Sequence, residues 1–552
     1  MRSSEVERRV FCLARCGAFD AASGVGFVAL VLVALATAAH YGISNDEGVQ
    51  QRYGELIIAY YASGLTDQSV FHFENLLYYG GLFDIVAVLV RHIVPADPYA
   101  IRHILCALIG IGGIGATWAT ARLVAGPRAG AIAGLALSVC GPWYGAMFNH
   151  TKDIPLAAAM MGATYFLIRA ARSFPQPAWS DVLGFGLSTG CALGMRVHGL
   201  LLVFYAGCTI LIFLPRSTSG HIHDRALLAA STALRLAPAL LLAYLVMILT
   251  WPWAALAPLN PLRALVVFDH FHYGIKTVAA GEIYEMASVP RWYVPLYLTI
   301  KLHLVMLTGA LVAVFATLTP KIGAFAERTW RRETTLVVLT AGFPVLCQVV
   351  AQAPAYTGLR HFLFVVPAIA VLAGIGLDIL LDILAERRHL LAHAAAVVLV
   401  GALVWNAGIL VQLHPDEYLF YNPLVGGLRG ASGQYETDYW VNTLPEAVEN
   451  LERFLARTDR SFAVSPRPRY TVTTCSQRVQ FDERTHPGLQ WTSDWPHADF
   501  FIAPTHMNCD RALDGRVIGT IERLGVTIAV VKDRRPQTRS TATAAPSESN
   551  IR

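Results

Sequence analysis

The chain has 552 residues, of which 55% are hydrophobic and only 15% are charged. Because soluble domains carry about 25% charged residues, this composition excludes an ordinary soluble protein and indicates repeated membrane spans. The formal net charge is small, +5, so the positions of the basic residues say more than their excess.

The N-terminal residues 1–22 are basic and precede an apolar run at 23–41. This run is longer than the apolar core of a signal peptide, and it continues into Tyr41 without a clear cleavage site. It therefore predicts an uncleaved signal anchor whose N-terminus lies in the cytoplasm.

Eleven apolar segments predict membrane helices. They lie near residues 23–41, 102–124, 128–148, 154–172, 182–197, 199–215, 233–253, 293–318, 335–352, 360–381 and 391–412. Small residues at 110–115, "GIGGIG", lie inside one of these segments and predict close helix packing rather than a nucleotide loop.

A twelfth apolar segment, residues 76–94, is interrupted by Asp84, Arg91 and His92. If this segment does not span, the basic clusters all lie on the side of the basic N-terminus, as the positive-inside rule requires. These clusters contain Arg122, Arg128, Arg169, Arg172, Arg216, Arg225, Lys321, Arg328, Arg331, Arg332, Arg387 and Arg388. We therefore expect the segment to lie at the membrane interface, with the N-terminus inside and the C-terminus outside.

The composition changes after about residue 413. Residues 414–533 contain one helix-like stretch and several short strand-like runs, which predict a small α/β domain outside the membrane. Residues 534–552 predict a disordered tail. The predicted fold is thus mainly α, a polytopic membrane helix bundle of about eleven spans with a small C-terminal extracytoplasmic α/β domain.

Two cysteines, Cys475 and Cys509, belong to this outer domain. An oxidising compartment favours disulfides, so we expect these two to pair, although spacing alone does not establish a pairing.

Acidic residues occur at the outer ends of two predicted helices. Asp46 and Glu47 follow the first span, and Asp153 stands in "NHTKDIP", the second outer loop. A carboxylate at a helix end is often only solvated. Two acids from separate loops, however, would meet at one acceptor hydroxyl and act as a general base, or would bind a divalent cation.

Basic residues lie on the same predicted face: Lys152, Arg196, His198, Arg360 and His361, with Lys301 inside a span. Each cation alone is compatible with a side chain that extends to the membrane surface. Several together predict a site for the phosphate of a lipid, because charged groups at membrane depth are costly and mark function.

Other motifs give weaker signals. His270 and His272 have the metal-ligand spacing of a strand but no third ligand nearby, so a loop against the membrane is the preferred interpretation. Glu436 and Asp438, in "YETDYW", either cap the site or fix the outer domain to the bundle, and the structural role is preferred. The sequence contains no Walker motif, nucleophile elbow or zinc-finger spacing.

Four stretches in this order resemble the family C membrane glycosyltransferases. They are "NDE" in the first outer loop, "NHTKDIPLAAAMMGATYFL" in the second, "LRHFLFVVPAIAVLAGIG" in a late span and "FYNPLVGGLRGASGQYETDYW" after the last span. Over about residues 20–440 the chain is most similar to the bacterial branch of the dolichyl-phosphate-mannose protein mannosyltransferase group (glycosyltransferase family 39-like). It departs from the aminoarabinose branch, because "FHFENLLYYGG" stands where that branch has a Lys-Pro-Pro motif. It also lacks the β-trefoil insertion of the eukaryotic protein mannosyltransferases.

The resemblance implies an inverting transfer of a sugar from a polyprenyl-phosphate donor to a lipid, glycan or protein acceptor outside the plasma (bacterial inner) membrane. Asp46 would be the base, Asp153 the second-loop acid and Glu47 its neighbour. The donor phosphate would contact Lys152, Arg360, His361, Lys301 and Arg196. No cofactor is required; a divalent cation, if one takes part, would bind Asp46 and Asp153. Nucleic acid is not among the implied partners.

Two alternatives from other classes remain. A secondary transporter would need charged or broken helices near the bilayer midplane and an internal repeat, whereas the acids here lie at the outer face. A non-catalytic assembly protein would use the outer domain to bind partners. Replacement of each acid by Asn distinguishes these classes, because only an enzyme would lose transfer while it still folds.

Overall fold

The computed structural model describes residues 2–214, 222–269, 274–319, 330–462, 466–482 and 485–536, with residues 2–16, 222 and 269 described by their backbone alone. Three sets of residues named above lie outside the described residues: the basic residues Arg216, Lys321 and Arg328, the His270–His272 motif, and most of the predicted tail.

The chain divides into two compact units, Met1–Asn442 with Arg523–Val526, and Thr443–Glu522 with Thr527–Arg552. The division lies after Asn442, whereas the sequence predicts a boundary after residue 413. The reason is that residues 414–442 bond to the helices. Asn422 donates to the carbonyl oxygens of Thr299 and Leu302 at 2.6 and 2.8 Å.

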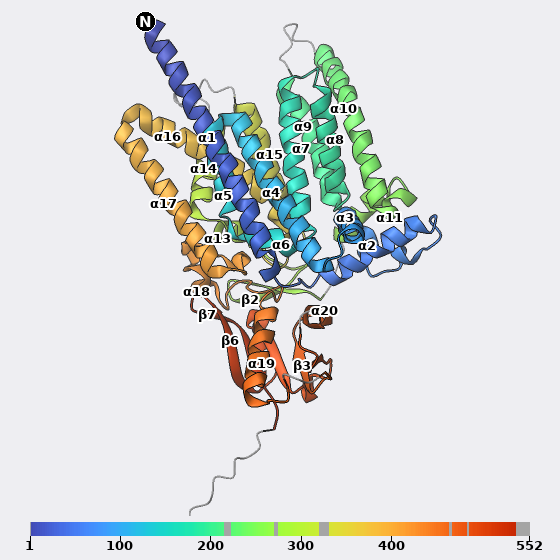
Figure 1. Cartoon of the computed structure of the whole chain (residues 1–552). Coiled ribbons are helices and arrows are strands. Elements are labelled where there is room, and N and C mark those ends of the chain that lie inside the picture. The colour runs from blue at the N-terminus through green and yellow to red at the C-terminus, as the bar shows by residue number, and fades with distance from the viewer. Residues whose placement is uncertain are drawn as a thin grey trace, which may run out of the picture. The chain divides into compact units, whose positions relative to one another are not determined.

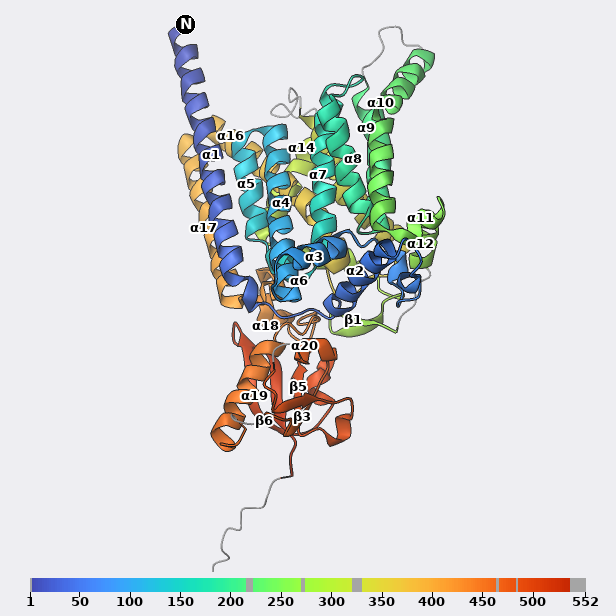
Figure 2. The ribbon, with the colours of Figure 1, turned by 45° about the vertical axis from the view of Figure 1, so that its right-hand side comes forward.

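Long apolar helices form most of the first unit (Figures 1 and 2). Among the described residues, seven are long and apolar enough to cross a membrane, or nine if each of two bent pairs is one span. The seven include α1 (Arg2–Thr37), α4 (Pro98–Ala125), α7 (Asp153–Arg172), α10 (Ile222–Thr250), α15 (Arg331–Ala351), α16 (Val366–Arg387) preceded by η6 (Arg360–Val365), and α17 (His389–Leu413). The chain is therefore an integral membrane protein.

The bent pairs are α5 (Pro127–Ser138) with α6 (Gly141–Asn149), at 64°, and α13 (Tyr293–Lys301) with α14 (Leu304–Leu318), at 119°. The remaining two predicted spans correspond to α8 (Trp179–Leu193) and α9 (Leu200–Phe213), which are shorter, at 15 and 14 residues. All eleven predicted spans thus coincide with helices.

Between α1 and α4 lie α2 (Glu47–Ala62) and α3 (Leu82–Ile93). Helix α3 has 12 residues, too few to cross a membrane, which agrees with the prediction that residues 76–94 do not span. Its Asp84 is fully buried while Ile93 is exposed. The helix therefore has one face on the bundle and one face away from it.

Glycines allow the central helices to approach closely. A Cβ atom on Gly376 of α16 would lie 1.9 Å from the carbonyl oxygen of Gly309 of α14, and one on Gly113 of α4 would lie 2.7 Å from the Trp143 ring. Only glycine fits at such crossings. The packing role predicted for the small residues at 110–115 is thus confirmed for Gly110 and Gly113, which face Met147 and Trp143.

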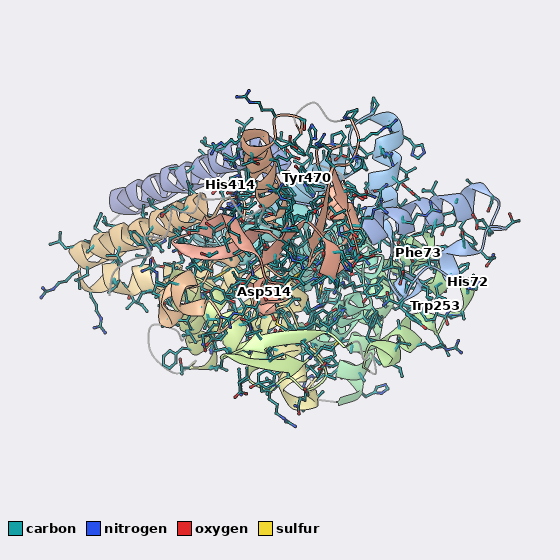
Figure 3. The ribbon with its side chains drawn as sticks, turned by 90° about the horizontal axis from the view of Figure 1, so that it is seen from below. His72, Phe73, Trp253, His414, Tyr470 and Asp514 are labelled. Carbon is teal, nitrogen blue, oxygen red and sulfur yellow. A yellow bond between two sulfur atoms is a disulfide. The ribbon has the colours of Figure 1, made fainter. Side chains whose placement is uncertain are left out.

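Short elements complete the first unit. They are η1 (Ala38–His40), η2 (Ser69–Phe71), η3 (Leu76–Tyr78), η4 (Val197–Gly199), α11 (Pro252–Leu256), α12 (Asn260–Asp269), β1 (Lys276–Ala279), β2 (Glu282–Glu285), η7 (Glu417–Leu419), η8 (Pro423–Val425) and α18 (Gly427–Ala431). Figure 3 labels three aromatic side chains of these segments and their neighbours, His72, Phe73 and Trp253.

Strands β1 and β2 form an antiparallel hairpin. Glu436 accepts hydrogen bonds from the Thr277 hydroxyl at 2.5 Å and the Val278 amide at 2.7 Å. Glu436 therefore fixes this hairpin within the first unit.

The second unit contains a five-stranded sheet of order β4-β3-β5-β7-β6. Strand β3 (Tyr470–Thr474) is parallel to β4 (Leu489–Trp491) and to β5 (Phe500–Pro504), and β5 is antiparallel to β7 (Val526–Asp533). The other elements are α19 (Leu444–Thr458), α20 (Arg478–Asp482), η9 (Trp495–His497), η10 (His506–Arg511) and β6 (Arg516–Arg523). The predicted α/β domain is confirmed.

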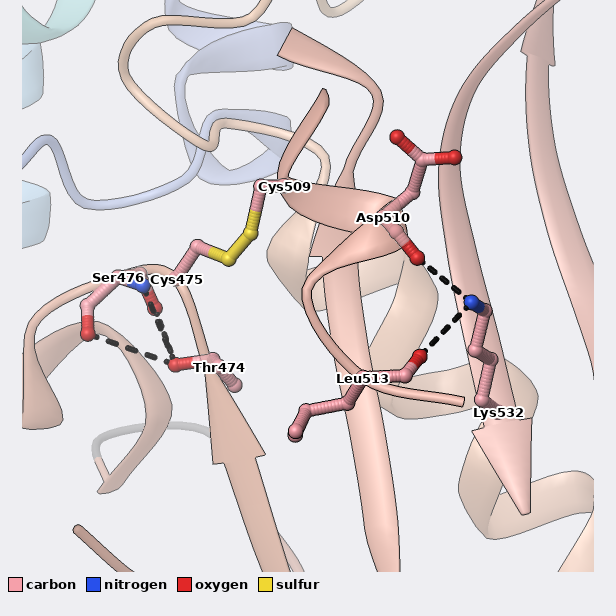
Figure 4. Close-up of a disulfide and its surroundings, with 7 residues drawn as sticks. All are labelled: Thr474, Cys475, Ser476, Cys509, Asp510, Leu513 and Lys532. Atoms are coloured by element: carbon pink, nitrogen blue, oxygen red, sulfur yellow. Dashed lines mark hydrogen bonds between the residues drawn. A yellow bond between two sulfur atoms is a disulfide. The ribbon is translucent and has the colours of Figure 1, made fainter. Parts of the chain in front are cut away.

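Cys475 and Cys509 form a disulfide in this unit, as predicted (Figure 4). Near it, the Lys532 ammonium donates to the carbonyl oxygens of Asp510 and Leu513 at 2.6 and 3.0 Å. The bridge thus joins the segment after β3 to η10, and Lys532 of β7 bonds both η10 and the residues that follow it.

Candidate functional site

The two outer-loop acids, Asp46 and Asp153, meet on one guanidinium group. Asp46 precedes α2, Asp153 begins α7, and Arg360 begins η6. Arg360 donates from Nε to Asp153 Oδ2 at 3.0 Å and from Nη2 to Asp46 Oδ2. Asp153 is 4% exposed, whereas the Asp46 side chain is 38% exposed. The more accessible acid therefore presents a carboxylate to solvent.

A second arginine, Arg196, lies on the other side of Asp153. Its Nη2 is 2.8 Å from Asp153 Oδ1, and its Nη1 donates to His361 Nδ1 at 3.3 Å. Because Nδ1 of His361 accepts this bond, the hydrogen of the neutral imidazole is on Nε2. We call Asp46, Asp153, Arg196 and Arg360 the outer cluster.

Arg196 and His361 line a cavity of about 230 Å³, together with Tyr79, His198 and Tyr356. Three of these lining residues each have a buried polar atom with no hydrogen-bond partner among the described residues: Arg196 Nε, His361 Nε2 and His198 Nδ1. Arg196 Nε and His361 Nε2 are donors, and buried donors without a partner are costly unless a ligand or water satisfies them. The wall is therefore suited to an anion.

The cavity adjoins an apolar groove of about 350 Å³ between α9 and α15. The two share His198, Leu265, Ala353 and Phe362, and the groove adds Phe204, Phe343 and Cys347 among others. A polar head and an apolar chain would thus find adjacent compartments.

Lys152 lies one residue before Asp153 and is buried, with Nζ 4.3 Å from the centroid of the Tyr79 ring. Burial lowers its pKa to about 8, an effect that the nearby carboxylate of Asp84 opposes. A cation–π contact stabilises the charged form. Lys152 therefore places a positive charge behind Tyr79, which lines the cavity beside Arg196.

Glu47 is separated from Asp46 although the two are adjacent in sequence. Its side chain is 0% exposed; it accepts from the Ser44 amide at 2.7 Å and lies 3.2 Å from His103 Nε2. Arg102 lies near it and is paired with Asp84 at 2.7 Å. We call Glu47, Asp84, Arg102 and His103 the buried cluster.

Lys301 also lies apart from Arg196 and His361. It donates to the Tyr418 carbonyl at 2.8 Å, and its Nζ is 3.7 Å from the centroid of the Tyr421 ring. It lines a separate cavity of about 20 Å³, whose wall also includes His150 and Arg360. This space is small, close to one water molecule.

Two residues of the site were not predicted from the sequence. The Arg360 guanidinium carbon is 4.1 Å from the centroid of the Trp440 ring, and the Trp440 indole donates to His150 Nε2. Both stand in motifs that were noted for their acids, "NHTKDIP" and "YETDYW". The sequence signal that could have identified them is their position close to an acidic residue of the same motif: His150 near Asp153, and Trp440 near Asp438.

A metal site is not formed by the described side chains. No group of three or more His, Cys, Asp or Glu among them is arranged to hold a metal ion. Asp46 and Asp153 both contact arginine instead.

Comparison with protein families finds a match over residues 88–255, to the family model described as dolichyl-phosphate-mannose-protein mannosyltransferase. The matched stretch contains Lys152, Asp153 and Arg196, and it ends before Arg360. The resemblance predicted from the sequence is confirmed over these residues. No curated protein matches the chain.

Solved structures with similar folds include ArnT from Cupriavidus metallidurans bound to undecaprenyl phosphate. The match to ArnT has 16% identity and a TM-score of 0.48, and it covers 92% of this chain and 98% of that chain. The archaeal oligosaccharyltransferase AglB from Archaeoglobus fulgidus, in complex with an inhibitory peptide and a dolichol-phosphate, has 12% identity, 87% and 70% coverage, and a TM-score of 0.46. The arabinofuranosyltransferase AftD from Mycobacteria has 12% identity, 92% and 41% coverage, and a TM-score of 0.41.

Proposed function

We propose that the chain is a membrane glycosyltransferase that moves a sugar from a polyprenyl-phosphate donor to an acceptor hydroxyl on the extracytoplasmic side. One observation supports this most directly: a cavity lined by Arg196 and His361 adjoins an apolar groove. The donor has the matching two parts, a phosphate head and a long isoprenoid chain.

In this proposal the donor phosphate binds Arg196 and His361. Arg196 Nε and the hydrogen-bearing Nε2 of His361 supply donors, and an arginine binds a phosphate through charge-assisted hydrogen bonds. Lys152 contributes positive charge from behind Tyr79. The isoprenoid chain lies in the groove beside Phe204 and Phe343.

Asp46 is the proposed general base. Its Oδ2 is bonded to Arg360, while Oδ1 has no hydrogen-bond partner among the described residues. The acceptor hydroxyl gives its proton to Asp46 as its oxygen attacks the anomeric carbon. The bond from that carbon to the phosphate oxygen breaks on the opposite face, which inverts the configuration. The electron pair leaves with the polyprenyl phosphate, whose charge the cations stabilise.

Asp153 and Glu47 have different proposed roles. Asp153 is enclosed by two arginines, so we assign it to positioning them rather than to proton transfer. Glu47 is buried with His103 and Ser44, so we assign it to fixing the first outer loop. The acceptor is a lipid, glycan or protein hydroxyl, and the membrane is the plasma (bacterial inner) membrane with the N-terminus inside.

The test uses purified protein in detergent with a panel of radiolabelled polyprenyl-phosphate sugars. Wild type is compared with Asp46→Asn and with Glu74→Gln, an exposed acid in the same outer segment. We expect turnover by wild type and Glu74→Gln and its loss in Asp46→Asn. Turnover that is equal in all three would exclude Asp46 as the base. Absence of turnover with every donor would contradict the proposed function.

A further inference from the structure

The position of Arg360 depends on an aromatic surface as well as on carboxylates. Its Nε and Nη2 edges are bonded to Asp153 and Asp46, and its face lies on the Trp440 ring. Bonds along the edge fix the guanidinium within its plane, and the ring fixes it perpendicular to that plane. Both Arg360 and Trp440 are buried, at 9% and 3% exposure, where a cation–π contact is strongest.

We infer that Trp440 is a positioning residue: it holds Arg360 where Asp46 and Asp153 meet, and His150 holds Trp440. This inference rests on the proposed function. It adds two residues to the site that neither touch the cavity beside Arg196 nor contribute a carboxylate.

The orientation of the Trp440 ring follows from its hydrogen bond to His150. The indole N–H donates to Nε2, so this nitrogen carries no hydrogen. The other nitrogen, Nδ1, lies 3.1 Å from Asn149 Oδ1, to which it donates. The Tyr439 hydroxyl lies 3.0 Å from the same Nε2. The tautomer with its hydrogen on Nδ1 therefore allows His150 to accept the indole hydrogen bond and to donate to Asn149.

Burial keeps His150 in this neutral state. It lowers the pKa of His150 to about 3, although the carboxylate of Asp153 opposes the effect. A protonated imidazole would donate from both nitrogens and would lose the indole bond. The hydrogen bond from the Trp440 indole to His150 is therefore kept across the physiological pH range.

The position of Asp46, the proposed base, depends on Arg360 more than the position of Asp153 does. Asp153 is held by Arg196 as well as by Arg360. Asp46 has Arg360 as its hydrogen-bond partner among the described residues, and its side chain is 38% exposed. A shift of Arg360 would thus displace Asp46 and leave Asp153 and the donor wall in place.

The experiment measures turnover and donor binding separately. Trp440→Leu removes the aromatic face, Trp440→Phe keeps a face but loses the N–H, and His150→Phe removes the acceptor. The control is Trp405→Leu, which replaces a tryptophan that is 70% exposed on α17. Turnover is measured with the donor panel above, binding with undecaprenyl phosphate in detergent, and folding by thermal unfolding.

We expect Trp440→Leu to lower kcat about 3- to 30-fold, the range that a buried cation–π contact predicts, and Trp440→Phe to lower it less than about threefold. His150→Phe should lie between them. The Kd for undecaprenyl phosphate should change less than twofold in all three variants. In an Arg360→Gln background, Trp440→Leu should cause no further loss, because its effect passes through Arg360.

Three outcomes overturn the inference. They are unchanged kcat in Trp440→Leu and His150→Phe, a rise in Kd that equals the fall in kcat, and an additive loss in the Arg360→Gln background. If Trp440→Leu does not fold, His150→Phe supplies the same test with the indole in place. Two results with the wild-type protein would contradict the proposed function itself. One is no binding of undecaprenyl phosphate, and the other is binding without turnover of any donor.

Discussion

The outer cluster and the buried cluster contain the same chemical groups, carboxylates and guanidinium groups, yet they differ in access. Asp46 in the outer cluster is 38% exposed, whereas Glu47, Asp84 and Arg102 in the buried cluster are 0% exposed. Asp46 and Glu47 are adjacent in sequence but point to different clusters, because α2 begins between them. Exposure of the carboxylate, rather than charge, distinguishes the candidate base from a member of a structural ion pair.

The largest expected difference is between Asp46→Asn and Glu47→Gln. Loss of a general base lowers turnover about 10²- to 10⁴-fold, so Asp46→Asn should reduce transfer by this factor without a change in Tm. Glu47→Gln should lower Tm while each folded molecule keeps its turnover. Transfer assays and thermal unfolding on the same preparations measure both. The comparison fails if Glu47→Gln lowers turnover as much as Asp46→Asn does.

Arg102→Gln should destabilise the protein more than Arg360→Gln does. It leaves Asp84 and Glu47 buried without their cation, and loss of one partner of a buried pair costs about 3–5 kcal/mol in the free energy of unfolding. Arg360→Gln should cost less, because Asp46 remains partly in water. Denaturant unfolding in detergent gives both values. Equal costs would contradict the distinction between the clusters.

Arg196→Gln should weaken the binding of undecaprenyl phosphate about ten- to hundredfold, since a hydrogen bond to a charged group contributes about 1.5–3 kcal/mol. Lys301→Gln is the matched control, because Lys301 lines a different cavity. Titration with undecaprenyl phosphate in detergent measures the two affinities. A larger loss in Lys301→Gln would move the phosphate site away from His361.

The smallest expected effect is a pH dependence due to Lys152. Its pKa of about 8 in the folded chain is below its ordinary value because of burial, so the lysine loses its charge as pH rises through about 8. Affinity for undecaprenyl phosphate should then fall about fivefold, as expected of one screened charge beside the guanidinium of Arg196. Stability should rise from pH 8 upward to the ordinary lysine pKa, because there the unfolded chain binds more protons than the folded chain.

The control for this prediction is Lys152→Met. The variant should bind with an affinity that is independent of pH between 7 and 9, close to the high-pH value of wild type. A wild-type affinity that rises with pH would show that Lys152 does not act on the phosphate.

Sequence patterns predicted the membrane bundle because each span needs a long apolar run, and they predicted the disulfide because only two cysteines fall in the outer unit. They placed the domain boundary too early, at residue 413, because polar, aromatic residues such as Asn422 and Tyr418 resemble a soluble domain in composition. In the structure these residues bond to the helices.

The candidate site was only partly predictable. The order of the loops placed Asp46 and Asp153 on one face, but it did not predict that Arg360 binds both. That contact joins residues more than 200 positions apart, so it depends on helix packing. Glu47 and Lys301 were grouped with the site by proximity in sequence or by charge. In the structure Glu47 belongs to the buried cluster, and Lys301 lines a cavity with Arg360 rather than with Arg196 and His361. Trp440 and His150 bear no charge at neutral pH and were therefore missed.

The Cys475–Cys509 disulfide provides a natural reporter of membrane sidedness. In cells treated with a thiol-alkylating reagent before lysis, these two sulfurs react only if the C-terminal unit has remained in a reducing compartment. A gel-mobility shift of a chain in which the other cysteines are replaced by serine would thus determine its orientation without a fused reporter enzyme. The same pair would follow translocation in time, because its protection from alkylation begins when the unit reaches an oxidising compartment.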